Sequence, residues 1–496
     1  MESDGREEES LTRVHGGDVA EAKEPEEQRV ICFYCGAGNP ATRSRCYTCW
    51  ATLETQPALT REEEERWISQ EQVRRRRRKR IRRTVIVGAV ALILGFVAYR
   101  ITGIGPSPSL PSSTISSQSA TGEWLMAQRD IQHTGVVPGP AFFPNGTTKW
   151  RFESQGHLRT NPVVADGRVY VATGDSRLVA LDEATGDVLW AHPFSMRVTS
   201  SSLTIAHELV FVGTHDRTLH ALDTKTGEQR WTYTTKGQLF GSATVADGSV
   251  YFGSTDGHLY SLDARTGELL WSSRRQFSAQ SIERITSSPT VNQGIAVVGS
   301  QDHNLYILDA ASGGRRYLLH VGNSINNAIT AVGDRAFFTS FGMVVAVDYT
   351  ERNFPFQKII WTVWRQLAIW RITSAPPHPP GVIWVRGIEG KVDGNLATAE
   401  GRLFVATGAG ILSALDTETG KPQWMVEGLA PLRSSPIITG DTVVQAAADG
   451  TIYGFDAASG EQRWSVSVGE GIVASPILVN GTLYVPTIDG SLYALQ

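Results

Sequence analysis

Short runs in which apolar and polar residues alternate, separated by glycine-containing turns, fill the chain from residue 123 to its end. The segment Asn161–Trp190 holds four such runs, separated at Asp166-Gly167, near Asp175 and at Thr185-Gly186. Alternation with a period of two indicates strands, and Asp-Gly pairs suit hairpin turns because glycine accepts a positive φ. The pattern therefore predicts four consecutive antiparallel strands in this segment.

One stretch of the pattern, Ala221–Trp231, recurs along the chain with an aspartate and a tryptophan eight positions apart. The close copies are Ala180–Trp190, Ser261–Trp271, Ala414–Trp424 and Gly454–Trp464; Ile307–Tyr317 is a looser copy and Ala346–Trp361 is interpreted as a stretched one. A period near forty residues is typical of repeat proteins, and four antiparallel strands per repeat describe one blade of a β-propeller. We expect the repeated tryptophans to pack between blades rather than to contact a ligand.

The copies can be counted by the residue that opens the first strand, which is Ser or Asn in every case. These residues are Asn161, Ser202, Ser242, Ser288, Asn327, Asn395, Ser435 and Ser475. The last copy stops at Gln496 without its fourth strand, whereas Asn145–Trp150 keeps the Gly-to-aromatic spacing of that missing piece. We predict that the strand of Trp150 completes the eighth blade and closes the ring, which removes exposed sheet edges. An open solenoid is the alternative, and the complementary deficit argues against it.

The predicted fold is therefore all-β: an eight-bladed β-propeller of four-stranded blades over residues 123–496. The pattern Ser-Ser-Pro, Val-Tyr-Val and Leu-Tyr-Ala-Leu-Asp-x-x-Thr-Gly-Glu-x-x-Trp resembles the repeat of the pyrroloquinoline quinone (PQQ)-like propellers. Trp124–Gly135 resembles the lead-in segment of that superfamily. Its members include quinoprotein alcohol dehydrogenases, the propeller of the outer-membrane β-barrel assembly machinery and sensor domains. Fold alone does not choose among these functions.

Catalytic motifs are absent from the sequence. The resemblance to quinoprotein dehydrogenases is confined to the repeat: no cysteine follows Cys49, so their adjacent cysteine pair is missing, and no set of Glu, Asn and Asp credibly holds their calcium. No HExxH, P-loop or nucleophile-elbow motif is present. We expect a non-catalytic binding or scaffold module for a protein or polar ligand, without PQQ. A single-pass sensor is the alternative, and a PQQ-dependent oxidoreductase is a third reading.

Two interruptions of the repeat are the candidate binding segments. The loop between Trp361 and Asn395 is enlarged by some twenty residues, and a shorter enlargement spans Ser272–Thr286. Both are interpreted as joining one blade to the next, which would place them on the face that bears the central funnel. Exposed Trp and Arg dominate binding hot spots. The candidates are Trp364, Arg365, Trp370, Arg371, Trp384, Arg386, Arg274, Arg275 and Arg284.

Each of these interpretations has a structural alternative. The tryptophans of the larger segment could instead form a lid packed on the propeller. The eight Ser and Asn residues could line the funnel mouth and hold water or a polar ligand, or could only cap the strands that they open.

The N-terminal part carries all four cysteines. Residues 1–30 are acidic and polar, and we expect them to be disordered. In the segment 31–52, Cys32, Cys35, Cys46 and Cys49 form two Cys-x-x-Cys knuckles, the ligand set of a structural zinc. This segment resembles small zinc ribbons and the Ran-binding-protein-2 type of zinc finger. Docking to another protein, binding to RNA and, without zinc, two disulfides remain alternatives.

A membrane anchor is predicted between the zinc ribbon and the propeller. We expect a polar and basic helix over 58–83, begun by the capping box Thr60–Glu63, and a transmembrane helix over 84–104. The net charge of −4 hides the arginine-rich run 74–83, which places the N-terminal flank in the cytoplasm and the propeller outside it. Nucleic-acid binding by this run is the alternative. Residues 105–122, rich in Ser and Pro, are a linker.

Overall fold

The computed structural model describes residues 29–32, 38–46, 51–54, 56, 58–60, 63, 66, 69–70, 81–82, 84–89, 119–120, 122–158, 160–199, 203–273, 284–350, 363–364, 366–372, 381–472 and 474–496. The chain divides into two compact units, Met1–Gly105 and Pro106–Gln496.

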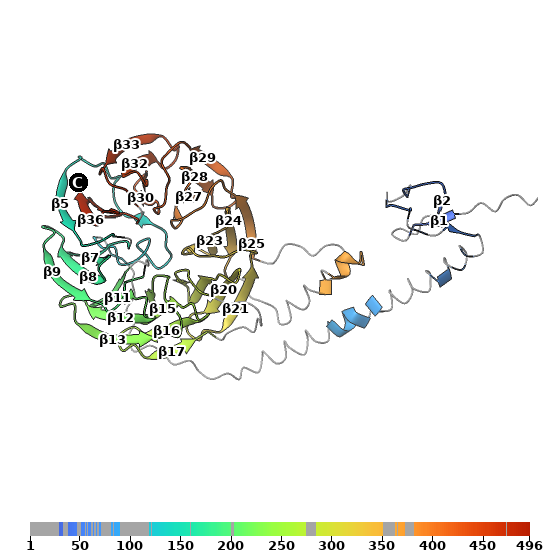
Figure 1. Ribbon diagram of the computed structural model, residues 1–496, viewed down its shortest axis with the longest axis horizontal. Helices are drawn as coiled ribbons and strands as arrows, with labels where there is room; N and C mark the ends of the chain where they lie inside the picture. The colour runs from blue at the N-terminus through green and yellow to red at the C-terminus, as the bar shows by residue number, and fades with distance from the viewer. Residues whose placement is uncertain are drawn as a thin grey trace, which may run out of the picture. The chain divides into compact units, whose positions relative to one another are not determined.

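The second unit is a ring of eight four-stranded antiparallel blades, which follow one another around the ring in chain order (Figure 1). Blades 1 to 4 consist of β6 (Val163–Ala165), β7 (Arg168–Thr173), β8 (Arg177–Asp182), β9 (Val188–Pro193); β10 (Thr204–Ala206), β11 (Leu209–Gly213), β12 (Thr218–Asp223), β13 (Gln229–Thr234); β14 (Thr244–Ala246), β15 (Ser249–Gly253), β16 (Leu259–Asp263), β17 (Leu269–Ser272); and β18 (Thr290–Asn292), β19 (Ile295–Gly299), β20 (Asn304–Asp309), β21 (Arg315–His320).

The remaining blades continue the same order. Blades 5 to 8 consist of β22 (Thr330–Val332), β23 (Arg335–Ser340), β24 (Met343–Asp348), β25 (Val382–Gly387); β26 (Ala397–Ala399), β27 (Arg402–Ala406), β28 (Leu412–Asp416), β29 (Pro422–Val426); β30 (Ile437–Thr439), β31 (Thr442–Ala446), β32 (Thr451–Asp456), β33 (Gln462–Ser467); and β34 (Ile477–Val479), β35 (Thr482–Pro486), β36 (Ser491–Leu495), β5 (Thr148–Glu153). The short strand β4 (Val136–Val137) pairs in parallel with β30.

Blade 8 confirms the predicted closure of the ring. Its fourth strand, β5, comes from the N-terminal end of the propeller and pairs antiparallel with β36, with Trp150 opposite Ala494. The backbone N–H of Asn145 donates to the carbonyl of Gln496 at 2.8 Å, so the two ends of the ring are joined by hydrogen bonds. The eight four-stranded blades predicted from the sequence are thus confirmed.

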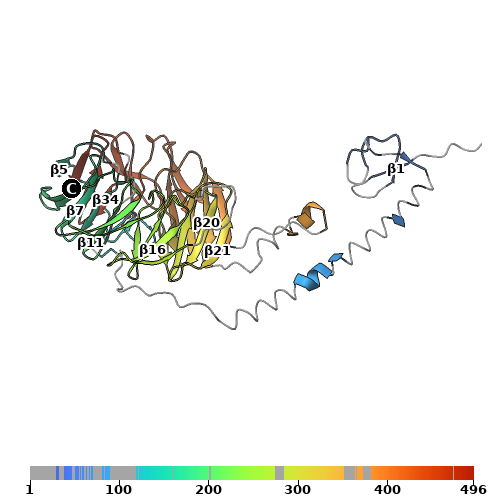
Figure 2. The ribbon, with the colours of Figure 1, turned by 60° about the horizontal axis from the view of Figure 1, so that its bottom comes forward.

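Antiparallel strands make successive connections emerge alternately on two faces of the ring (Figure 2). One face carries the turns between the second and third strands of each blade and the loops that join successive blades; we call it the ring face. The opposite face carries the turns between the first and second strands and between the third and fourth strands. We call it the strap face, after the segment of residues 119–143 described below.

Tryptophans join neighbouring blades near the strap face. The indole of Trp190 covers Gly227 of the next blade, where an added Cβ would lie 2.6 Å from the ring, and its N–H donates to the Thr224 carbonyl at 3.0 Å. Gly227 also has a φ of 72°, so glycine is required both for the turn and for the close approach. Equivalent latches are formed by Trp150, Trp231, Trp271, Trp384 and Trp424.

The apolar cores lie between adjacent blades. One cluster combines Phe211 and Leu219 of blade 2 with Val250 and Phe252 of blade 3, and the other clusters of this unit likewise combine neighbouring blades. Among the described residues, these clusters draw only on residues 124–496. In the described part of the chain, the core of the propeller is thus built from propeller residues.

The larger enlargement of the repeat lies elsewhere than predicted. The third strand of blade 5 ends at Asp348 and the fourth begins at Val382, with Ala346 paired to Trp384. The residue that completes the blade-5 repeat is thus Trp384 and not Trp361. Residues 349–381, which we call the extension, connect two strands within one blade and leave from the strap face. The expectation that this segment joins blade 5 to blade 6 on the funnel face was wrong.

The first unit contains a small sheet around two cysteines. Strand β1 (Arg29–Ile31) pairs with β2 (Gly38–Pro40) and with β3 (Ala58–Leu59). Cys32 and Cys46 are buried together with Val30 and Leu53, whereas Cys35 and Cys49 lie outside the described residues. Because Ala58 and Leu59 are a strand, the predicted helix cannot begin at residue 58. It begins after Thr60, whose N–H donates to the Glu63 carboxylate at 2.9 Å.

The predicted membrane-spanning segment is described only in part. Within the predicted span 84–104, residues 84–89 are helical and exposed, and the remainder lies outside the described residues. In the described part of the chain, no helix has both the length and the apolar character needed to cross a bilayer. The acidic residues 1–28 and most of the linker also lie outside the described residues.

Candidate binding site

Most of the Ser and Asn residues that open the first strands form a circle of hydrogen bonds between blades. The side-chain oxygen of each of these residues accepts a hydrogen bond from the backbone N–H of the equivalent residue in the preceding blade. Ser435 N–H donates to Ser475 Oγ at 2.8 Å, and Ser475 N–H donates to Asn161 Oδ1 at 2.8 Å, which joins blade 8 to blade 1. The pairs Ser242–Ser288 and Asn395–Ser435 are the same, at 2.9 Å each. These side chains hold the ring face together; Ser202 lies outside the described residues.

Blade 5 departs from this circle. Ala328 occupies the position predicted for Asn327, because it is the Ala328 N–H that donates to Asn395 Oδ1, at 3.0 Å. The prediction for Asn327 was wrong by one residue. The Asn327 amide instead donates to the carbonyls of Gly394 and Val392, at 2.8 and 3.1 Å. The side chain of Ala328 has no oxygen that could accept a hydrogen bond from blade 4, so the circle of side-chain acceptors is interrupted there.

A second set of side chains surrounds the mouth on the ring face. Each lies two positions before the residue that opens the first strand; we call the described members, Phe240, Thr286, Asn326, Asp393 and Arg433, the rim. Thr286 Oγ1 and Asn326 Oδ1, from neighbouring blades, are 3.0 Å apart, so these positions adjoin around the mouth. Asn326, Asp393 and Arg433 are exposed. The rim therefore offers an aromatic ring, hydroxyl and amide groups, and both signs of charge.

The hairpin between β23 and β24 carries the most exposed large apolar side chain of the described propeller. Phe341 is 86% exposed and has a φ of 35°, and with Gly342 it forms a two-residue turn on the ring face. In blades 1, 2 and 8 the corresponding turn instead holds an aspartate that accepts hydrogen bonds from its own turn. Blade 5 thus replaces a polar turn by an unshielded aromatic at a strained backbone position.

The candidates predicted from the enlarged segments do not form one site. Trp384 is a blade latch whose indole N–H donates to the Thr417 carbonyl at 3.0 Å, so its assignment as a binding residue was wrong. Arg386 is exposed on the outer strand β25, and Arg284 is exposed on the ring face. Trp364, Trp370 and Arg371 belong to the extension and therefore to the opposite face. Arg274, Arg275 and Arg365 lie outside the described residues.

Residues 119–143, which we call the strap, line the inner strands of the blades. Backbone carbonyls of the strap accept hydrogen bonds from backbone N–H groups of six blades. The acceptors, each followed by its donor, are Trp124 (Val164, 2.8 Å), Leu125 (Ile205, 2.7 Å), Ile131 (Val291, 3.3 Å), Gln132 (Ala331, 2.8 Å), Thr134 (Thr398, 2.9 Å) and Gly135 (Ile438, 2.9 Å). The strap thus occupies the centre of the ring beside these inner strands. The resemblance of Trp124–Gly135 to a lead-in gave no hint of this role.

Polar side chains of the strap are buried and bonded. Gln128 is 3% exposed, and its amide donates to the Leu396 carbonyl at 2.8 Å. Both ring nitrogens of the fully buried His133 lie within 3.1 Å of carbonyl oxygens, those of Ala127 and Pro289. These side chains therefore direct their hydrogen bonds to carbonyls of the strap and of the blades.

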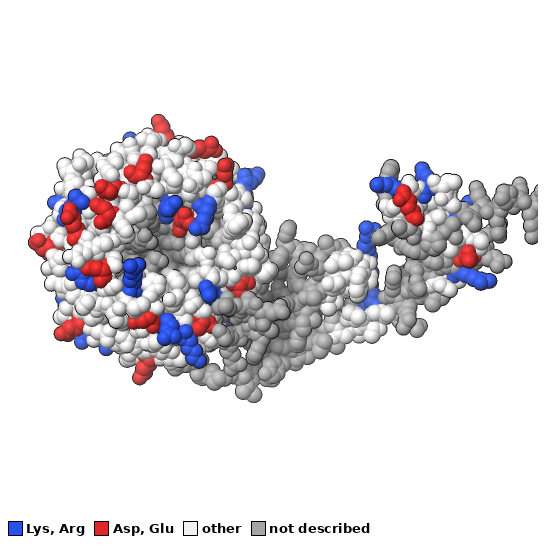
Figure 3. Space-filling view, viewed as in Figure 1, with Lys and Arg blue, Asp and Glu red and all other residues white. Residues whose placement is uncertain are grey.

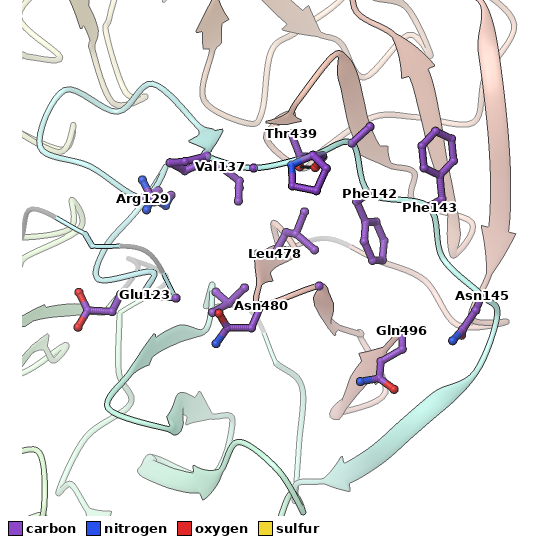
Figure 4. A pocket seen from close by; sticks show the side chains of 17 residues that line it. Glu123, Arg129, Val137, Phe142, Phe143, Asn145, Thr439, Leu478, Asn480 and Gln496 are labelled. Atoms are coloured by element: carbon purple, nitrogen blue, oxygen red, sulfur yellow. Dashed lines mark hydrogen bonds between the residues drawn. The ribbon is translucent and has the colours of Figure 1, made fainter.

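A cavity of 490 Å³ lies where the strap passes blades 7 and 8 on the strap face. Figure 4 shows its apolar side chains, Phe142 and Leu478, between charged Glu123 and Arg129 on one side and the amides of Asn145 and Gln496 on the other. The face of the propeller seen in Figure 3 has Lys and Arg interspersed with Asp and Glu around a central depression. Mixed charge of this kind suits a specific contact better than non-specific binding of a polyanion.

Comparison with known proteins identifies the family of the propeller. A family model described as outer membrane protein assembly factor BamB matches residues 143–207, 180–353 and 358–496, well over half of the chain. The chain belongs to this family. No curated protein sequence shows a significant match to the chain.

Solved structures of this fold carry different functions. The crystal structure of BamB from Moraxella catarrhalis superposes with a TM-score of 0.55 at 16% identity, over 71% of this chain and 97% of that one. The computationally designed protein Ika8 gives 0.57 at 17% identity, over 69% and 97%. Quinohemoprotein alcohol dehydrogenase from Comamonas testosteroni gives 0.59 at 17% identity, over 76% and 81%. At these identities the likeness shows the fold alone, so catalysis is left open by it.

Proposed function

We propose that this protein is a membrane-tethered, non-catalytic docking platform whose propeller binds a protein partner outside the cytoplasm through its ring face. The observation that carries the proposal is Phe341, 86% exposed at the tip of a tight hairpin. An exposed aromatic on a face that also carries mixed polar and charged groups is the composition of a binding surface. The rim residues Asn326, Asp393 and Arg433 supply those groups.

The strap supports a non-catalytic role. It places buried side chains at the centre of the ring whose polar atoms are already bonded to the propeller, as Gln128 is to the Leu396 carbonyl. A scaffold gains rigidity from such filling, whereas an enzyme needs polar groups that are available to substrate. Membership of a family described as an assembly factor is consistent with this role. We therefore expect no PQQ in the protein.

The membrane tether rests on the sequence. The arginine-rich run 74–83 followed by the apolar run 84–104 favours a single-pass anchor with the N-terminus in the cytoplasm. In sequence, the linker leads directly into the strap. The anchor predicts that the full chain resists extraction from membranes by alkaline carbonate.

A structural zinc in the first unit is the second element of the proposal. Cys32 and Cys46 are 0% and 1% exposed and belong to one small cluster, and the amide of buried Asn39 donates to Cys46 Sγ at 3.6 Å. An N–H directed at sulfur is the usual outer partner of a metal-bound thiolate, so the described residues fit zinc. Cys35 and Cys49 would complete the tetrahedral set. Metal analysis of the full chain should return about one zinc.

The docking proposal is tested by crosslinking in native cells. A photo-crosslinking residue in place of Phe341 should capture one discrete partner, and the substitution Phe341→Ala should abolish its co-purification while leaving the thermal midpoint unchanged. The matched control is Phe143, which is 59% exposed on the strap face. Equal capture from both positions, or co-purification unaffected by Phe341→Ala, would contradict the proposal.

A further inference from the structure

The extension is an unusual addition to a propeller because it is built on a rigid base. The Asp348 N–H donates to the Gly381 carbonyl at 2.7 Å, which ties the two ends of the extension together. Tyr349 is fully buried, its N–H donates to the Asp334 carbonyl at 3.1 Å, and its hydroxyl donates to the Gly333 carbonyl at 2.6 Å. The extension therefore leaves from a fixed point on the strap face.

The described middle of the extension is a short apolar helix. Residues 363–364 and 366–369 are helical, and two hydrogen bonds, from Ile372 N–H to Leu367 O and from Arg371 N–H to Ala368 O, both 2.9 Å, end the helix. Arg371 takes the left-handed conformation, with a φ of 55°, that this type of helix end requires. The helix therefore has a defined end, where Trp370 and Arg371 lie side by side.

Large apolar side chains of this segment are exposed to solvent. Ile369 is 62% exposed, Trp370 is 66% exposed and Val363 is 43% exposed. In sequence, the extension contains the basic residues Arg352, Lys358, Arg365 and Arg371 and one acidic residue, Glu351, close to its base. Exposed Trp and Ile together with a net positive charge is the chemistry of segments that lie in the interface of an anionic bilayer.

The chain enters the propeller on the same face that carries the extension. Gly122 lies against Asn480, in the turn between β34 and β35, where an added Cβ would be 3.0 Å from the amide oxygen. Trp124 then pairs with Val164, next to the corresponding turn of blade 1. Residues 105–118, fully extended, reach at most roughly 50 Å. A membrane that holds the anchor is therefore within reach of the strap face.

We propose that the extension is a second membrane contact, which inserts Ile369 and Trp370 into the surface of the anionic lipid bilayer that holds the proposed anchor. The inference rests on the anchor of the proposed function for its orientation, and on the described helix for its chemistry. The proposed binding partner of the helix is lipid and not a second copy of the chain.

The test uses residues 106–496, a unit that buries its own core, so that the anchor cannot contribute. This fragment should co-sediment with vesicles of phosphatidylcholine and phosphatidylglycerol, and much less with pure phosphatidylcholine vesicles. The double substitution Ile369→Ser and Trp370→Ser should weaken binding by roughly tenfold or more, because two exposed apolar side chains lose their contact with lipid. Arg371→Glu should weaken binding mainly at low salt. The control Met425→Ser, at a 55% exposed apolar residue of the outer strand β29, should bind as the unaltered fragment does.

Several results would overturn the inference. One is a fragment that binds neither kind of vesicle while the full chain still resists carbonate extraction, which would leave the anchor intact. Another is unchanged binding by the Ile369→Ser, Trp370→Ser fragment with an unchanged thermal midpoint. A third is concentration-dependent dimerisation in sedimentation velocity that the double substitution abolishes, because it would assign the helix to a second copy of the chain.

Discussion

The two faces of the propeller hold neighbouring blades together by different chemistry. Near the strap face an indole covers a glycine of the next blade, as Trp190 covers Gly227, and the strap adds backbone hydrogen bonds at the centre. On the ring face, small side chains such as Ser435 and Ser475 pass hydrogen bonds from blade to blade. The apolar latches use large side chains, whereas the polar circle uses small ones. Small side chains are therefore enough to join the blades on the ring face.

The largest effect should come from removing an apolar latch. Trp190→Ala should lower the free energy of unfolding by about 3–5 kcal/mol, because it leaves a cavity over Gly227 and removes the hydrogen bond to Thr224. Trp190→Phe, which keeps a ring but loses the N–H, should cost roughly a third of that. Urea titration of residues 106–496, followed by circular dichroism, measures both. Equal losses for the two variants would show that the hydrogen bond and not the packing joins the blades.

A break in the polar circle should cost less. Ser435→Ala removes the acceptor of the Asn395 N–H and should cost about 1–2 kcal/mol, because a buried donor is left without a partner. The reverse change is Ala328→Ser, which supplies an acceptor where blade 5 lacks one and should stabilise by up to about 1 kcal/mol. The same urea titration compares them. If Ser435→Ala were neutral, the circle would be a consequence of the fold and not a cause of its stability.

Acid should weaken the strap-face turn that Asp456 stabilises. The N–H of Ser459 above all, with the Ser459 hydroxyl and the Arg463 guanidinium, lowers the pKa of Asp456 to about 2. A lowered pKa in the folded protein stabilises it at pH values above the usual 3.8, and this contribution is lost as the pH falls through the folded-state pKa. Asp456→Asn should therefore lower the free energy of unfolding by about 1 kcal/mol at pH 7, seen as a lower thermal midpoint, and the loss should shrink progressively as the pH falls from about 4 to about 2. A loss of the same size at pH 7 and at pH 2 would assign the effect to shape and not to charge.

Much of the fold could be predicted from the sequence because each blade repeats the same physical solution. An aspartate bonds its own turn, a glycine takes a positive φ and a tryptophan packs on the next blade. The same regularity revealed that Trp150 must complete blade 8, since the last copy lacks its fourth strand. Repetition thus constrains the number of blades and the way the ring closes more strongly than it constrains any single loop.

The errors arose where one blade departs from the repeat. The extension contains Trp361, Trp364 and Trp370, and Trp361 was mistaken for the blade tryptophan; the glycine shortly before Trp384 was the better signal. Asn327 was predicted because the other copies open with Ser or Asn. The interval of five residues to the first turn, which holds from Asn161 to Asp166 and from Ser435 to Gly440, would have selected Ala328.

The binding residues were harder to predict because nothing in the repeat marks them. The rim lies two positions before a conspicuous Ser or Asn, and its members share no residue type. Phe341 stands where other blades have aspartate, but a single phenylalanine after a strand is typical of a core residue. Only the fold shows that its ring meets solvent.

The strap also decides how the propeller responds to mechanical load. In the proposed tethered protein, a pull on the linker reaches Trp124, which is bonded to blade 1, and then residues 125–135, which are bonded to the inner strands of blades 2, 4, 5, 6 and 7. The load is therefore shared among many strands at the centre and does not peel one strand from an outer edge. Because the strap is bonded to the inner strands of several blades, a pulling force must break several sets of hydrogen bonds before any blade separates.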